Sequence, residues 1–404
     1  MRSLTHDLKE ELLLKAEELI FSTGIGDVAE KLCFMNTRYG IAKLLYMQKE
    51  FGIKKTPYFL GTPDMTITRN RVRWNQGFGY GGKISFGPKI KNNFFPLDIK
   101  PNACGMLVGG IHNLPSYTLL IEKLSKLEEK KIEIDGIPVK WDFYDSNHFI
   151  DVFEIEPLGS ENFPPYAFIL HTSASELKDK TKKGIGLYFD VSKSLREKSK
   201  ILNTPFGPLY YLVDEDVKEY IEFYFYAQSF AERKRLIAAE ELFGSFDIIS
   251  NDTHQGILNE GEVLLGAHYF EDENKIFPFV MRSDLPAYLV KGIPNIKKEV
   301  LKSLDFLRRA KKYGLLEELK NSNLIPHGSG YNFPHILSIN GVREVQNRRL
   351  FELLLTWGTK GVEIIETPRD LPFEYRGQKV FIRIIELSLA KPVAKLNPVY
   401  VLKF

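Results

Sequence analysis

Apolar and polar residues recur along this chain with two different periods, and these periods predict which segments are helices and which are strands. Helical spacing is clearest near the N-terminus, where Gly24 supplies a stop signal after the first segment, and again in the second half of the chain. The helical segments that we expect are residues 5–22, 28–51, 215–243, 296–321 and 342–356.

Strands are expected between these helical segments. From residue 58 to residue 111 glycine becomes frequent, and short apolar runs alternate with turns. The tail at 379–403 is also typical of strands, broken by Pro392 and Pro398. The other segments in which we expect strands are 83–86, 106–111, 132–143, 148–155 and 166–171.

The order of these elements predicts the fold class. Strands and helices do not alternate in the regular way that builds a doubly wound parallel sheet, and no repeat or low-complexity linker divides the chain. We therefore expect an α+β protein. It would have an N-terminal helical segment at residues 1–57 and one large domain at residues 58–404, in which mixed β-sheets are surrounded by helices.

Composition excludes several classes of protein. Hydrophobic residues make up 44% and charged residues 26% of the 404 residues, so the chain can bury a core and global disorder is excluded. No apolar run approaches the length of a membrane span, and acidic residues stand where a signal peptide needs an apolar core. With only two cysteines, Cys33 and Cys104, we expect a reduced, cytoplasmic protein with no membrane partner.

Two basic stretches leave a question open in a chain whose formal net charge is only +3. Arg69, Arg71 and Arg73 alternate beside Trp74, and eight Lys and Arg residues lie between residues 178 and 200. A solvated surface produces patterns of this kind. Each stretch could also contact a phosphate backbone, with Trp74 stacking on a base.

Several histidines and one cysteine lie at the ends of apolar strands or beside glycines. The candidates are His148 in SNHFID, His171 after YAFIL, His254 in DTHQG, His327 in PHGSG and Cys104 in NACGM. Imidazole nitrogens and thiolates are ligands that transition metals prefer. No CxxC or HExxH spacing is present, so the spacing alone leaves a metal site and ordinary core or turn residues both open. We expect structural or surface roles for His6, His112, His268 and His335, and a core position for Cys33.

Taken in order, these segments resemble the RtcB family of RNA ligases, and the resemblance extends from residue 74 to residue 404. The similar segments are NQGFGYGGKISF (75–86), PNACGM (101–106), SNHFID (146–151), LHTSAS (170–175), YAQSFAERKRLI (226–237), DTHQG (252–256), PHGSGY (326–331) and AKPVAKLNPVYVLKF (390–404).

The resemblance implies an enzyme that joins RNA 3′-phosphate or 2′,3′-cyclic phosphate ends to 5′-hydroxyl ends, as in tRNA processing or RNA repair. Cys104 would bridge two Mn²⁺ ions, with His148 on one ion and with His171 and His254 on the other. His327 would attack the α-phosphate of GTP and become guanylylated. The residues implied to contact the guanine nucleotide are Asn147, Phe149, Asp151, Gln255, Arg282, Ser283, Tyr375 and Lys403. The implied partners are RNA, a guanine nucleotide and, in some settings, an activating protein.

The chain also departs from the family pattern. The family's metal-binding aspartate, three residues before the cysteine, is Pro101 here, and Asp98 is the candidate substitute. The metal site with Cys104, His171 and His254 is intact by residue type, whereas the other has lost a ligand, so we expect one or two Mn²⁺ ions. The family's glycine-rich phosphate loop falls at residues 279–288, which contain no glycine, so Arg282 and Ser283 would have to replace its contacts. Two alternatives to the ligase therefore stay open. One is a diverged paralogue with a changed nucleotide or substrate, and the other is a catalytically silent RNA-binding protein.

Overall fold

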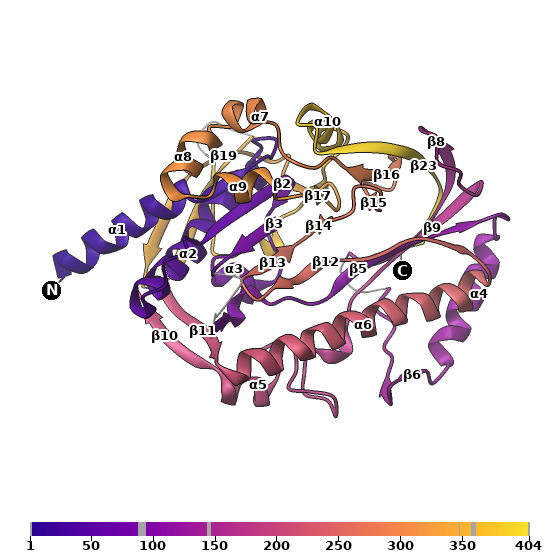
Figure 1. The fold of residues 1–404 in the computed structure, drawn as a ribbon, viewed down its shortest axis with the longest axis horizontal. Helices are drawn as coiled ribbons and strands as arrows, with labels where there is room; N and C mark the ends of the chain where they lie inside the picture. The colour runs from indigo at the N-terminus through magenta and orange to yellow at the C-terminus, as the bar shows by residue number, and fades with distance from the viewer. Residues whose placement is uncertain (1, 88–93, 144–146, 347, 357–360, 403–404) are drawn as a thin grey trace.

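The computed structural model describes residues 2–87, 94–143, 147–346, 348–356 and 361–402. Its centre is one eleven-stranded sheet, with helices along both of its sides (Figure 1). In spatial order the strands are β1 (Ile20–Ser22), β2 (Tyr58–Thr66), β3 (Tyr80–Ser85), β13 (Glu262–Leu265), β12 (Asp247–Asn259), β5 (Cys104–Ile111), β9 (Tyr166–Thr172), β8 (Phe149–Pro157), β23 (Ala390–Leu402), β16 (Ala287–Gly292) and β15 (Ile276–Phe279).

The register of the central strands brings distant parts of the chain together. The edge pair β1–β2 is parallel, whereas β12, β5, β9 and β8 pair with one another antiparallel. Within these pairs Gln255 lies opposite Cys104, and His171 lies opposite both Met106 and Phe149. Segments far apart in the sequence therefore meet at one end of these strands.

Helices cover the sheet on both sides. Figure 1 shows α6 running beneath β12 and β5 with α4 beside its far end, whereas α7 to α10 gather on the opposite side. The helices are α1 (Arg2–Glu18), α2 (Val28–Phe51), α3 (Arg71–Asn75), α4 (Tyr117–Glu129), α5 (Lys193–Lys198), α6 (Glu215–Phe243), α7 (Lys298–Ser303), α8 (Phe306–Tyr313), α9 (Leu316–Lys320) and α10 (Lys379–Glu386).

Five small sheets complete the described part of the chain. Two have three strands and three have two. They are β10 (Lys200–Thr204), β11 (Gly207–Val213) and β4 (Phe94–Pro96); β19 (Ile336–Val345), β20 (Arg348–Leu355) and β21 (Val362–Ile365); β14 (Ala267–Tyr269) and β17 (Leu324–Pro326); β18 (Tyr331–Asn332) and β22 (Glu374–Tyr375); and β6 (Glu133–Ile134) and β7 (Ile137–Pro138).

The two longest helices have the bounds that the sequence predicts. Helix α2 begins after Asp27, whose side chain accepts a hydrogen bond from the Glu30 backbone, and it ends at Gly52 with φ of 67°. Helix α6 contains no glycine or proline and stops at Gly244. The prediction for residues 5–22 is wrong at its end, because α1 stops at Glu18 and the chain continues as strand β1.

Three predictions in the second half need correction. The expected helix at 342–356 is part of the β19–β20 hairpin, in which the buried Phe351 and Leu353 alternate with Glu352. The expected helix at 296–321 is three short helices, because the backbone takes left-handed angles at Asp305 (φ 53°) and Gly314 (φ 70°). The tail begins with helix α10 and then forms one strand, β23.

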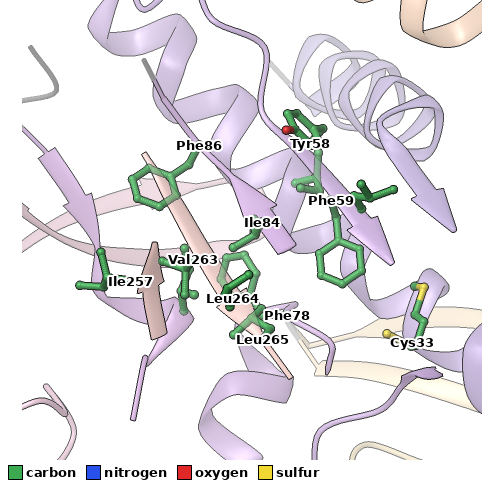
Figure 2. Packing of buried hydrophobic residues seen from close by; sticks show 14 of the residues in the cluster. Cys33, Tyr58, Phe59, Phe78, Ile84, Phe86, Ile257, Val263, Leu264 and Leu265 are labelled. Carbon is green, nitrogen blue, oxygen red and sulfur yellow. The ribbon is translucent and has the colours of Figure 1, made fainter. Parts of the chain in front are cut away.

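The main core lies between α2 and the strands β2, β3 and β13. Figure 2 shows part of it, with Phe59 of β2, Ile84 of β3, Leu264 of β13 and Cys33 of α2 among the labelled side chains. Cys33 is fully buried, and burial raises the pKa of its thiol to about 12. The predicted core position of Cys33 is confirmed.

At the level of fold class the prediction holds, because the molecule combines helices with a large multi-stranded sheet. The boundary between residues 57 and 58 stays a prediction. Among the helices of the described segments, none is both long enough and apolar enough to cross a membrane.

Candidate metal and nucleophile site

Cys104 opens strand β5 after a loop that is held in an unusual conformation. Lys100 (φ 54°) and Ala103 (φ 56°) both adopt left-handed backbone angles, which non-glycine residues rarely accept. The buried Arg73 holds this loop, because its Nε donates to the Ile99 carbonyl at 3.0 Å and its Nη2 to the Lys100 carbonyl at 2.6 Å. The loop therefore presents the Cys104 thiol from a fixed position.

The thiol and three imidazoles form one contiguous group. Cys104 Sγ lies 2.9 Å from His171 Nε2 and 3.7 Å from His148 Nε2. His171 Nε2 in turn lies 3.3 Å from His254 Nε2. The ligand atoms of Cys104, His148 and His171 all lie within 4.8 Å of one another, a spacing that one metal ion can bridge.

Contacts behind two of the rings fix their orientation. His148 Nδ1 lies 2.9 Å from the Asp142 carbonyl and 3.2 Å from Asp142 Oδ2, and His171 Nδ1 lies 3.1 Å from the Asn147 carbonyl. Each contact occupies the nitrogen on the far side and leaves Nε2 facing Cys104. Metal-binding histidines commonly show this arrangement.

Without an ion, the group pairs a thiolate with a protonated imidazole. Burial alone would raise the pKa of the Cys104 thiol, but His171 and His148 outweigh burial and lower this pKa to about 5. Burial opposes protonation of His148, yet Asp142 and Cys104 raise its pKa to about 10. Burial, together with His327 and His171, holds the pKa of His254 well below its usual range. A cation would therefore bind beside the Cys104 thiolate and the neutral His254, and His148 would have to release its proton to become a ligand.

His327 stands directly beside this group. Its ring centroid is 4.5 Å from that of His254. Its Nδ1 lies 2.9 Å from Oδ2 of the buried Asp64, and Asp64 also accepts hydrogen bonds from the Thr62 hydroxyl at 2.6 Å and the Gly328 amide at 3.3 Å. With its proton on Nδ1, His327 keeps the lone pair of Nε2 for chemistry.

A cavity of about 90 Å³ adjoins both His171 and His327. Five of the residues implied to contact a nucleotide line it, namely Asn147, Phe149, Asp151, Ser283 and Tyr375. The other lining residues are Thr66, Tyr80, Met106, Val280, Met281, Gly328, Ser329, Gly330 and Tyr331.

The remaining implied nucleotide contacts lie elsewhere. Arg282 does not line the cavity, because its guanidinium forms a bidentate pair with Asp284 at 2.9 and 2.6 Å. Gln255 is buried and does not line the cavity; its carboxamide lies 3.2 Å from the hydroxyl of Tyr80, a lining residue, and close to Arg73. Lys403 lies outside the described residues.

Asp98 does not replace the missing aspartate of the metal group. It is fully buried and lies 4.0 Å from Lys43 Nζ, while its Oδ1 accepts a hydrogen bond from the Tyr210 amide at 3.3 Å.

Trp74 is also unsuited to its suggested role, because it is 1% exposed and its indole donates to the Glu366 carbonyl. Base stacking on Trp74 is therefore excluded.

Three residues of the site were missed by the sequence predictions. Two of these residues could have been found from the sequence. Asp64 is a charged residue within an apolar strand, and Lys234 lies between Ala231 and Ala238 at the spacing of the buried face of α6. Asp142 carried no such signal. His268, expected to be structural or exposed, is buried with its ring centroid 5.7 Å from that of His254, so only the structural expectation stands.

Comparison with known proteins finds no family model that matches this chain and no curated protein that matches it. The resemblance of the sequence to RtcB ligases therefore stays a prediction.

Proposed function

We propose that this protein is a metal-dependent RNA ligase of the RtcB type, which joins RNA 3′-phosphate or 2′,3′-cyclic phosphate ends to 5′-hydroxyl ends through a guanylylated His327. One observation supports this above all. The contacts Cys104–His171, His171–His254 and His254–His327 form an unbroken line across the site, although the four residues come from four distant segments.

The side chains clustered around the Cys104 thiol are suitable ligands for a divalent transition-metal ion. Cys104, His148 and His171 would hold it, with His254 beside them. A bound ion supplies positive charge next to phosphate oxygens. The contacts of Asp142 and of the Asn147 carbonyl orient the two imidazoles.

In the proposed reaction Asp64 holds the Nδ1 proton of His327, and His327 Nε2 attacks the α-phosphorus of GTP. A nitrogen–phosphorus bond forms while the bond to the bridging oxygen breaks, and pyrophosphate leaves. At a 2′,3′-cyclic phosphate end, water first breaks the bond between phosphorus and O2′ and leaves a 3′-phosphate and a 2′-hydroxyl. An oxygen of the RNA 3′-phosphate then displaces His327 from the guanylate. Finally the 5′-hydroxyl attacks the activated 3′-phosphate, loses its proton, and expels GMP as the strand is sealed.

A second candidate is a diverged paralogue with a different nucleotide. The observation in its favour is that no Lys or Arg stands among the described residues that line the cavity, while Arg282 is engaged with Asp284. Proteins normally bind a triphosphate through Lys and Arg side chains. The aromatic residues Phe149, Tyr331 and Tyr375 still offer stacking surfaces for a base.

The test is a ligation assay with two RNA oligonucleotides, one labelled in its 3′-phosphate and one with a 5′-hydroxyl. Each nucleoside triphosphate is supplied in turn to protein loaded with metal. We expect GTP to give a joined product whose label resists phosphatase. The product should be lost in His327→Gln and kept in His112→Gln, whose side chain is 76% exposed.

The other outcomes separate the alternatives. Joining with a triphosphate other than GTP would favour the diverged paralogue. RNA binding without joining, in folded and metal-loaded protein with every nucleotide, would contradict the ligase and leave the RNA-binding protein.

A further inference from the structure

The cluster formed by Cys104, His148 and His171 contains no carboxylate. Among the residues that the structure describes, the three side chains grouped within 4.8 Å are Cys104, His148 and His171, and no Asp or Glu joins them. Pro101 has no side-chain ligand atom, and Asp98 is engaged with Lys43 and the Tyr210 amide. The group therefore offers sulfur and nitrogen only.

Two carboxylates stand behind histidines of the site. Asp142 faces Nδ1 of His148, on the side away from Cys104, and it also accepts a hydrogen bond from Lys234 at 3.0 Å. Asp64 faces Nδ1 of His327. Both carboxylates orient an imidazole and have partners of their own, so neither is placed to supply an oxygen ligand.

Two separations between ligand atoms match the edges of a small tetrahedral site, whereas His254 lies outside the group whose ligand atoms are all within 4.8 Å of one another. Zinc–sulfur and zinc–nitrogen bonds of about 2.3 and about 2.05 Å give tetrahedral edges of about 3.6 Å between sulfur and nitrogen and about 3.3 Å between nitrogens. Cys104 Sγ to His148 Nε2 is 3.7 Å, and His171 Nε2 to His254 Nε2 is 3.3 Å. The third separation, from Cys104 Sγ to His171 Nε2, is shorter at 2.9 Å.

We infer that this centre takes a single ion of the zinc class, held by Cys104, His148 and His171 with His254 beside the fourth position, in place of the manganese pair that the family resemblance implies. Thiolate and imidazole ligands favour Zn²⁺ and its neighbours, whereas Mn²⁺ favours carboxylates and binds most weakly in the series of divalent ions. A manganese pair bridged by Cys104 does not fit a donor set without a carboxylate. The inference rests on the donor set and not on the proposed ligase activity.

The first test measures metal content. The full chain is stripped with a chelator and then dialysed against Zn²⁺ and Mn²⁺ together, with Mn²⁺ in roughly tenfold excess. Atomic emission should then find about one zinc and almost no manganese per chain. This measurement uses the wild-type protein and does not depend on whether a variant folds.

The second test replaces zinc by Co²⁺ and records the absorption spectrum. We expect a thiolate-to-cobalt charge-transfer band and the intense visible bands of a tetrahedral ion. Both should disappear in Cys104→Ser and persist in Cys33→Ser, since Cys33 is buried in the core on α2.

The inference is overturned by two manganese ions per chain in the competition, by no stoichiometric metal at all, or by a cobalt spectrum that survives Cys104→Ser. Its failure is distinguishable from failure of the proposed function. A protein that binds one zinc but joins no RNA keeps the inference and loses the ligase, and a ligase loaded only with manganese does the reverse.

Discussion

Replacing Lys234 with methionine tests whether a buried charge supports the site from behind. Lys234 is fully buried on α6, and its ammonium lies 3.0 Å from Asp142 Oδ1, 3.0 Å from Glu176 Oε1 and 3.2 Å from the Ser173 carbonyl. Although burial opposes ionisation, His148 and Lys234 hold the pKa of Asp142 well below its usual range. Methionine keeps the apolar stem but removes the cation that two buried carboxylates share, so that Glu176 loses its charged partner and Asp142 keeps only His148 as a charged partner.

The expected loss of stability follows from the burial. Removing one partner of a buried ion pair costs about 3–5 kcal/mol, because the remaining charge stays uncompensated. For a chain of this length that loss corresponds to a fall of about 4–6 °C in the unfolding midpoint. Because Asp142 also orients His148, metal affinity should fall by about 10–100-fold in the same variant. Differential scanning calorimetry and a zinc titration measure the two effects.

The matched control is Lys198→Met. Lys198 also contacts two carboxylates, those of Asp216 at 2.8 Å and Glu219 at 2.7 Å, but its side chain is 36% exposed. Exposed pairs of this kind contribute about 0–1 kcal/mol. If Lys234→Met and Lys198→Met shifted the midpoint equally, the argument from burial would be refuted.

Two further predictions concern aspartates. In Asp64→Asn the carboxylate that lies 2.9 Å from His327 Nδ1 becomes neutral. The proposed reaction places a hydrogen bond to a charged group here, and such a bond is worth about 1.5–3 kcal/mol. The rate of guanylylation in a quenched-flow assay should therefore fall by about 10–150-fold, with a smaller fall in Thr62→Val. An unchanged rate in Asp64→Asn would remove the role assigned to this carboxylate. Burial, opposed by Lys43, raises the pKa of Asp98 from 3.8 to about 7. Between these two pH values the folded protein therefore binds more protons than the unfolded chain. Its free energy of unfolding should fall as the pH rises through this range. Asp98→Asn should flatten that slope in urea unfolding measured from about pH 4 to about pH 8, and an equal slope in both proteins would count against it.

Local signals were enough to predict the long helices. Both α2 and α6 combine helical spacing with a glycine stop, and neither bound depends on distant contacts. The segment 342–356 failed because its run LFELLL fits helical spacing as well as alternation, and pairing with β19 decides between them. Helix α10 was missed for the corresponding reason, since its eight residues precede a strand of similar composition.

The residues of the candidate site were predicted from the order of the segments that resemble the RtcB family. Physical reasoning could not bring these residues together, because strand register cannot be read from the sequence alone. What the sequence could not predict is clear in the run of three basic residues on α6, Arg233, Lys234 and Arg235. It reads as a solvated basic patch, yet only Arg233 reaches outward, to Asp135, while Lys234 and Arg235 are fully buried. The direction in which a helix faces the sheet decides which charge becomes part of the site.

The central claim is that His327 is a nucleophile beside a metal centre, and mapping a nucleotide adduct tests it most directly. Metal-loaded protein would be incubated with GTP, digested at alkaline pH to preserve a phosphoramidate, and examined by peptide mass spectrometry. We predict one guanylate, carried on His327 and absent when the folded Cys104→Ser variant is used. No adduct on the loaded wild-type protein, or an adduct on a residue other than His327, would contradict the account.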